Sequence, residues 1–218
     1  MSDTTWISLY GSFYRHRNLV YAKSFGSEDR YWVNLFVSMG WTQVSFNNID
    51  WDNDQVFSFI IDPVKRRTRS VVNCLMENNY LNLLNDNGFC NFLKWLPAID
   101  INSLSYHDIW HDYCDKIKWF PADLPNVDSF SLLENYAQEF NSQKLSRANL
   151  LTTYNNPWLL EASLEDHSLK HDVNEFRSEE KQELFKKITE LFGDGVHYTW
   201  QYLSKDIELY EDTCKPFI

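Results

Sequence analysis

Two histidines spaced four residues apart are the side chains of this sequence best suited to bind a metal ion. His107 and His111 stand at the ends of the run His-Asp-Ile-Trp-His, and residues at i and i+4 project from the same side of a helix. Asp115 continues this row, so that two imidazoles and one carboxylate can bind a metal ion and activate its water. The pattern predicts a metal-dependent hydrolase built on His107 and His111, with Asp115, or a more distant residue such as Glu134, as the third ligand.

The same segment also fits the solvent-facing side of an amphipathic helix, and this is the interpretation we prefer. The Glu of the metalloprotease pattern H-E-x-x-H is replaced by Asp108, whose side chain is shorter. Asp112, Asp115 and Lys116 are typical of a solvated helix face with the histidines at its border. A match of five residues covers too little of the chain to indicate a family. Neither a metal ion nor any other cofactor is expected.

A second acidic run, Asp50-Trp51-Asp52-Asn53-Asp54, has the alternating carboxylates of a calcium-binding loop. Counted from Asp50, however, Gln55 stands where that loop needs glycine, and Ile61 stands where it needs a bidentate glutamate. Asp and Asn also favour turns, because their side chains hydrogen-bond to nearby backbone amides. The run therefore predicts a polar hairpin turn between two strands.

Basic side chains gather in two short groups. Lys65-Arg66-Arg67-Thr68-Arg69 has four cations in five residues, and Arg15-His16-Arg17 is a smaller group. Such groups can hold phosphate or an acidic peptide. The larger group precedes a predicted helix, where cations oppose the helix dipole. We expect an internal or a solvated role for it, with the acidic second half of the chain as one candidate partner.

The charge of the chain is negative and unevenly distributed. The formal net charge is −11, which argues against a protein that grips nucleic acid through its phosphates. Residues 1–109 carry 9 basic and 11 acidic side chains, whereas residues 110–218 carry 11 basic and 20 acidic ones. An acidic half of this kind is suited to a basic protein partner. The residues predicted to contact it are Asp108, Asp112, Asp115, Glu161, Glu165, Asp166, Asp172, Glu175, Glu179 and Glu180.

These observations favour a non-enzymatic acidic binding protein of the inhibitor or immunity type. It would occlude a basic protein, such as a nuclease toxin or a nucleic-acid-handling complex, with aromatic side chains as interface anchors. The alternatives are the metal-dependent hydrolase and a structural or assembly component of a phage or bacterial complex. The first residues lack the features of a signal peptide, and no apolar stretch reaches membrane-spanning length. We therefore expect a cytoplasmic protein without membrane or direct nucleic-acid contacts.

Strands are predicted for most of the first 62 residues. Apolar runs rich in β-branched and aromatic residues, separated by Gly, Asn, Asp and Ser, occupy 6–10, 19–25, 31–39, 41–49 and 56–61. The 31–39 run does not alternate strictly, so that a short helix is the alternative there. The last two runs flank the 50–54 turn and are expected to pair as a hairpin.

Helical spacing of apolar residues dominates the rest of the chain. It predicts helices over 66–87 and 89–96, and a helix after Ser105, which forms a capping pattern with Asp108. Ser131 and Glu134 form a capping box for a further helix ending near 140. The clearest helix starts at 178 and ends at Gly193. Residues 196–202 alternate with a period of two and predict a strand, followed by a short helix over 205–212.

The predicted fold class is α+β. An N-terminal antiparallel sheet of four to five strands, joined by a late strand near 196–203, packs against a set of C-terminal helices. One domain over 1–218 is expected, with a strand-rich part (1–62) and a helix-rich acidic part (66–218). Cys74, Cys90 and Cys114 stand within apolar patterns and are expected to act as small hydrophobic residues.

Overall fold

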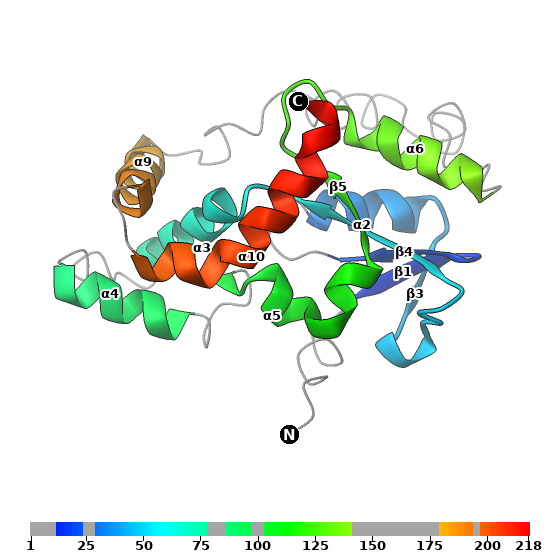
Figure 1. Cartoon of the computed structure of the whole chain (residues 1–218), viewed down its shortest axis with the longest axis horizontal. Coiled ribbons are helices and arrows are strands. Elements are labelled where there is room, and N and C mark those ends of the chain that lie inside the picture. The colour runs from blue at the N-terminus through cyan, green and yellow to red at the C-terminus, as the bar shows by residue number, and fades with distance from the viewer. Residues whose placement is uncertain (1–11, 24–28, 78–85, 97–102, 141–178, 194–196) are drawn as a thin grey trace.

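The structure is a computed structural model that describes residues 12–23, 29–77, 86–96, 103–140, 179–193 and 197–218. It contains a mixed sheet of five strands, which lies toward the right-hand end of the long axis in Figure 1. The strands lie in the order β3-β1-β2-β4-β5. Their bounds are Phe13–His16 (β1), Leu19–Ala22 (β2), Thr42–Val44 (β3), Gln55–Ile60 (β4) and Lys118–Pro121 (β5). Helices follow mostly in the C-terminal part, so the α+β prediction is confirmed.

The strand pairing differs from the predicted antiparallel sheet. β1 pairs antiparallel with β2 and with β3, whereas β2–β4 and β4–β5 are parallel pairs. The predicted hairpin across the 50–54 turn is therefore wrong, because β3 pairs with β1 at the sheet edge. Every position of β4 from Val56 to Ile60 is buried, which suits a central strand, whereas β3 is mostly exposed. The actual hairpin turn is Arg17-Asn18, and Arg17 adopts a positive φ of 56°.

Helices cover both faces of the sheet, and the alternation along β4 shows which residues face which layer. Phe57 and Phe59 pack with α2 (Asp29–Ser38) and α6 (Ser129–Glu139). Val56 and Ile60 point to the opposite face, toward α5 (Tyr106–Trp110) and the 3-10 helix η5 (His111–Lys116). α10 (His197–Cys214) lies on this second face and crosses in front of α3 and β5 (Figure 1).

A third group of helices packs beside the sheet at one end of the long axis (Figure 1). It consists of α3 (Pro63–Glu77), α4 (Asp86–Trp95) and α9 (Glu179–Gly193). Their shared core includes Leu75, Phe92 and Ile188, which are all fully buried. The predicted helical spacing in 66–77, in 89–96 and after 178 is thus confirmed. The boundary predicted between 87 and 89 is wrong, because Asn87 and Gly88 lie inside α4, and residues 78–85 lie outside the described residues. The remaining short elements are the 3-10 helices η1 (Phe46–Asn48) and η7 (Lys215–Phe217).

Two predicted strands are helices. The 31–39 run lies in α2, so its helical alternative is correct, because Trp32, Leu35 and Phe36 share one buried helix face. The predicted late strand over 196–203 lies at the start of α10. The strands β1 and β5 were not predicted, and the strand expected over 6–10 lies outside the described residues.

At one helix the residue that caps the N-terminus differs from the prediction. α6 begins after Asp128, whose carboxylate accepts hydrogen bonds from the backbone N–H of Phe130 and Ser131. The capping box predicted at Ser131 and Glu134 is therefore wrong, since both residues lie inside the helix. Ser105, by contrast, caps α5 as predicted, and its hydroxyl accepts from the Asp108 N–H at 2.9 Å.

We expect Phe59→Ala to lower the free energy of unfolding by about 3–5 kcal/mol. The Phe59 ring is fully buried and stacks on Trp32 with ring centroids 3.7 Å apart, so truncation leaves a cavity between β4 and α2. Urea unfolding measures the change. The control Val37→Ala, at a side chain 52% exposed on α2, is expected to change stability by less than about 0.5 kcal/mol. Equal effects of the two substitutions would contradict this packing.

Candidate functional site

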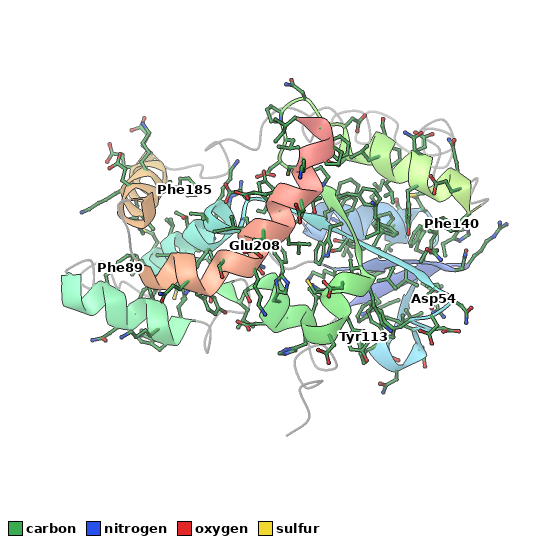
Figure 2. All side chains as sticks on the ribbon, in the orientation of Figure 1. Asp54, Phe89, Tyr113, Phe140, Phe185 and Glu208 are labelled. Atoms are coloured by element: carbon green, nitrogen blue, oxygen red, sulfur yellow. The ribbon has the colours of Figure 1, made fainter. Side chains whose placement is uncertain are left out.

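Two acidic segments that are distant in the sequence meet on the surface of the protein. Trp51 of the 50–54 turn packs on Tyr113 of η5, with ring centroids 4.3 Å apart (Tyr113 is labelled in Figure 2). Lys116 Nζ of η5 lies 3.7 Å from Asp52 Oδ1 of the turn. The exposed carboxylates of the two segments are Asp50, Asp52, Asp112 and Asp115, and we name these four residues the acidic surface.

The 50–54 turn holds its own shape through side-chain hydrogen bonds. Asp50 accepts from Asp52 N–H at 3.2 Å and from Asn53 Nδ2 at 2.8 Å. Asp54 accepts from Asp50 N–H at 2.8 Å and from the guanidinium of Arg15. The hydrogen bonds from Asn53 and Asp52 lower the pKa of the Asp50 carboxyl, which keeps its charge to a lower pH than an ordinary aspartate. The prediction of a polar turn at these residues is confirmed.

Aromatic side chains anchor this surface to the core. Besides packing on each other, Trp51 and Tyr113 both contact Phe46, with ring centroids 5.7 and 5.1 Å away. Trp51 also meets Phe13 of β1 edge to face at 6.4 Å. Because Trp51 and Tyr113 are half-buried, each presents part of an aromatic ring beside the carboxylates. The arrangement offers negative charge next to a rigid apolar contact.

His107, the first residue of the predicted metal site, is bound to a buried carboxylate. Asp206 of α10 is fully buried and accepts from the Tyr106 N–H at 2.6 Å and the His107 N–H at 3.2 Å. His107 Nδ1 lies 2.8 Å from Asp206 Oδ1. A carboxylate only accepts hydrogen bonds, so Nδ1 carries the proton and donates it here. Only Nε2 of this imidazole is then open to another group.

The row of ligands predicted through His111 is interrupted. α5 ends at Trp110, and His111 adopts φ 45° and ψ −128°, outside the helical region. His107, His111 and Asp115 therefore do not continue along one α-helix, as the predicted pattern requires. Within the residues that the structure describes, no group of three or more His, Cys, Asp and Glu side chains is placed to hold a metal ion.

The basic run Lys65–Arg69 lies in the first turns of α3 and not before the helix as predicted, and two of its residues have an internal role. Arg66 and Arg67 are buried, and their guanidinium groups lie over the rings of Tyr106 and Tyr202 at 3.9 and 4.6 Å. Arg67 also donates to the carbonyls of Ser103 and Leu93. Arg66 Nη2 is 3.8 Å from Asp206 Oδ2, so the run does meet a carboxylate of the acidic second half.

A pair of carboxylates lies where the parallel strands β4 and β5 end. Asp62 follows β4, and its side chain accepts from the N–H of Val64 and Lys65 at the start of α3. Asp123 follows β5 and accepts from Asp62 N–H at 3.1 Å and from the Tyr210 hydroxyl at 2.9 Å. Burial raises the pKa of the Asp123 carboxyl. Sequence reasoning missed this pair, although an aspartate just after a buried strand was a visible signal.

The residues predicted to bind a partner do not all come together. Asp112 and Asp115 are exposed on η5, and Asp108 is partly buried beside them on α5. Glu179 and Glu180 lie on α9, and Phe185 of that helix and Asp54 are labelled toward opposite ends of the long axis in Figure 2. The other five, Glu161, Glu165, Asp166, Asp172 and Glu175, lie outside the described residues. Asp50 and Asp52 were not among the predicted partner-binding residues.

Comparison with known proteins yields no family model, no curated protein and no solved structure that matches the chain. Among the helices in the described ranges, none is long and apolar enough to cross a membrane. The function is therefore inferred from the geometry of this chain alone.

We expect Asp206→Asn to lower the free energy of unfolding by about 3–5 kcal/mol, because it leaves the buried Arg66 facing a neutral group. An amide also places an N–H where Asp206 accepts several donors. Urea unfolding measures the loss. Asp212→Asn, at an exposed position of the same helix, is the matched control and is expected to change stability by less than about 0.5 kcal/mol. A loss no larger than that of the control would show that Asp206 does not help to hold α10 against α5 and α3.

The raised pKa of Asp123 predicts how the stability of the folded protein changes with pH. Its pKa is raised above 3.8 in the folded protein, so its stabilising contribution is fully present below pH 3.8 and is lost as the pH rises through the folded-state pKa. The stability of the unmodified protein relative to Asp123→Asn is therefore expected to fall between about pH 3 and pH 7. Urea unfolding at several pH values measures this difference. A constant or rising difference would contradict the prediction.

Proposed function

We propose that this protein is a non-enzymatic acidic binding protein that occludes a basic protein partner through the acidic surface. The observation that carries the proposal is the meeting of the 50–54 turn with η5 around the Trp51–Tyr113 pair. It joins carboxylates from the nearly neutral first half of the chain to carboxylates of the acidic second half. The two segments thus bring exposed carboxylates and the Trp51 and Tyr113 rings close together.

The charge of this surface supports recognition of a basic protein. Asp50, Asp52, Asp112 and Asp115 are all exposed, and Lys116 is the cation placed nearest to Asp52 in the described structure. Exposed charges of one sign steer an oppositely charged partner and raise its association rate more than they raise the final affinity. Binding is therefore expected to weaken steeply as salt is added.

The Trp51–Tyr113 pair supplies apolar contact area for the partner, which the carboxylates alone do not. Trp and Tyr are enriched among the residues that dominate binding energy, and here both rings are held by the core. Lys116 Nζ already lies 6.0 Å from the Tyr113 ring centre and 3.7 Å from Asp52. An arginine or lysine of the partner is expected to bind in the same way, with its cation between a carboxylate and a ring.

This chemistry suits a partner that itself handles nucleic acid. Proteins that bind phosphate backbones present clusters of lysine and arginine, and an acidic protein surface competes for those side chains. The mechanism we propose is steric occlusion, with the acidic surface covering the basic face of a nuclease toxin or of a nucleic-acid-handling complex. An inhibitor or immunity protein of this kind would act in the cytoplasm.

The two alternatives stay predictions without a supporting contact in the described structure. A hydrolase using His107 and His111 would need further metal ligands from outside the described residues. A structural or assembly component of a phage or bacterial complex would be a stable oligomer, which size measurement of the purified chain detects.

Affinity capture from native lysate at low salt tests the binding proposal. The full chain is compared with a variant in which Asp52, Asp112 and Asp115 are all replaced by Asn. The unmodified chain is expected to retain a basic protein that high salt releases, and the variant is expected to retain at least about tenfold less. Once the partner is purified, the association rate is expected to fall by a similar factor for the variant.

The matched control replaces Glu139, Glu183 and Glu190 by Gln, three exposed carboxylates on α6 and α9. It changes the net charge by the same amount without altering the acidic surface, and it is expected to retain the partner like the unmodified chain. Equal losses in both variants would show that net charge alone matters. That result, or the absence of any salt-released basic protein, would overturn the proposal.

A further inference from the structure

One side chain of the smaller basic group reaches the 50–54 turn from the sheet. Arg15 lies in β1, an inner strand that pairs with β2 on one side and with β3 on the other. Phe13, two residues earlier, shares this face of the strand and meets Trp51 edge to face. Arg15 therefore extends from a fixed strand toward the side of the sheet on which the turn packs.

The guanidinium of Arg15 contacts the chain on both sides of the turn. Its Nη2 donates to the Asn48 carbonyl at 2.8 Å, before the turn begins, and to Oδ2 of Asp54, where the turn ends (Asp54 is labelled in Figure 2). The same Oδ2 accepts from the Asp50 N–H at 2.8 Å. One nitrogen atom thus joins both ends of the turn to β1.

The contact between Arg15 and Asp54 is more sheltered from water than the contact between Lys116 and Asp52. The side chains of Arg15 and Asp54 are 27% and 9% exposed, whereas those of Lys116 and Asp52 are 47% and 89% exposed. Salt screens a partly buried ion pair less than an exposed one, and exposed pairs contribute little to stability. The Arg15–Asp54 contact is therefore suited to fix the turn, whereas the Lys116–Asp52 contact is easily exchanged for a contact with a partner.

The charge of Arg15 and its hold on the turn have opposite effects on the binding of a basic partner. Its positive charge reduces the negative potential around the turn, which by itself weakens the attraction of other cations. Its contacts fix the turn before binding, which removes the entropic cost of ordering a loop. Because the two effects differ in sign, removal of Arg15 shows which of them is larger.

We propose that Arg15 is a positioning residue of the acidic surface, which holds the 50–54 turn in the shape that binds the partner. This inference rests on the proposed function and deepens it. Arg15 carries the same sign of charge as the partner, so it acts through Asp54 and Asn48 and not by attracting the partner itself. A substitution that makes the chain more negative is therefore expected to weaken its binding of cations.

Binding of a hexa-arginine peptide to the purified full chain, measured by calorimetry at low salt, tests the proposal. Arg15→Met makes the chain more negative by one charge, yet it is expected to lower the affinity at least about fivefold. The matched control is Arg17→Met, which makes the same charge change at the exposed turn of the β1–β2 hairpin. It is expected to keep the affinity or to raise it.

Hydrogen exchange shows whether Arg15 acts by holding the turn. The amides of Asp50 and Asp54 are hydrogen-bonded across the turn, to Asp54 Oδ2 and to the Asp50 carbonyl. In Arg15→Met they are expected to exchange at least about tenfold faster, while the amides of β4 stay unchanged. Arg17→Met is expected to leave both sets of amides unchanged. Arg15→Gln removes the same charge with a shorter side chain, and it repeats both measurements if Arg15→Met does not fold.

Three results would overturn the positioning role and leave the proposed function standing. The first is a peptide affinity of the Arg15 variants that equals or exceeds that of Arg17→Met. The second is unchanged exchange at Asp50 and Asp54 in the Arg15 variants. The third is an equal acceleration of exchange in the turn and in β4, which is the effect of a residue that only stabilises the whole fold.

Failure of the proposed function itself gives a different pattern. The variant in which Asp52, Asp112 and Asp115 are replaced by Asn is expected to bind the peptide at least about tenfold more weakly than the unmodified chain. Full affinity of this variant would show that cations bind elsewhere on the protein. That result would overturn the proposed function, and the positioning role of Arg15 with it.

Discussion

The buried carboxylate of Asp206 is the interaction on which the arrangement of the second sheet face depends. A charge without access to water is tolerated only when hydrogen bonds and an opposite charge surround it. Asp206 meets this condition with the amides of Tyr106 and His107, the His107 ring and the nearby Arg66 guanidinium. These partners belong to α5 and α3, so the carboxylate sets the position of α10 against both helices. η5 follows α5 directly, and the acidic surface therefore rests on the same interaction.

The sheet explains why that surface is rigid. Along β4 the aromatic residues Phe57 and Phe59 face α2 and α6, while Val56 and Ile60 face α5 and η5. Trp51 and Tyr113 join the second of these clusters, so that a partner would meet rings already fixed by the core. Binding then orders few side chains, which lowers its entropic cost.

Local signals in the sequence predicted part of this structure correctly. The cap at Ser105, the helical spacing in α3, α4 and α9, and the turn at 50–54 depend on residues close together in the chain. The errors have a common cause. Periodicity identifies a helix through an apolar stripe, and the stripe of α10 consists of Tyr202, Asp206 and Tyr210, so that its alternating aromatic residues indicated a strand instead. β3 and β4 flank one turn, yet β3 pairs with β1, because strand pairing depends on contacts far apart in the sequence.

The candidate site was likewise predictable from the sequence only in part. The sequence by itself determined that the second half is acidic, that Asp112 and Asp115 lie on the solvent side of their segment, and that the 50–54 run is a turn. Only the tertiary structure decided that Asp52 lies beside Lys116 and η5, and that His107 is bound to Asp206. Caps and turns depend on neighbouring residues and can be predicted from local order. A surface, by contrast, forms where segments that are distant in the sequence pack together. Local patterns in one sequence do not show which of these segments come into contact.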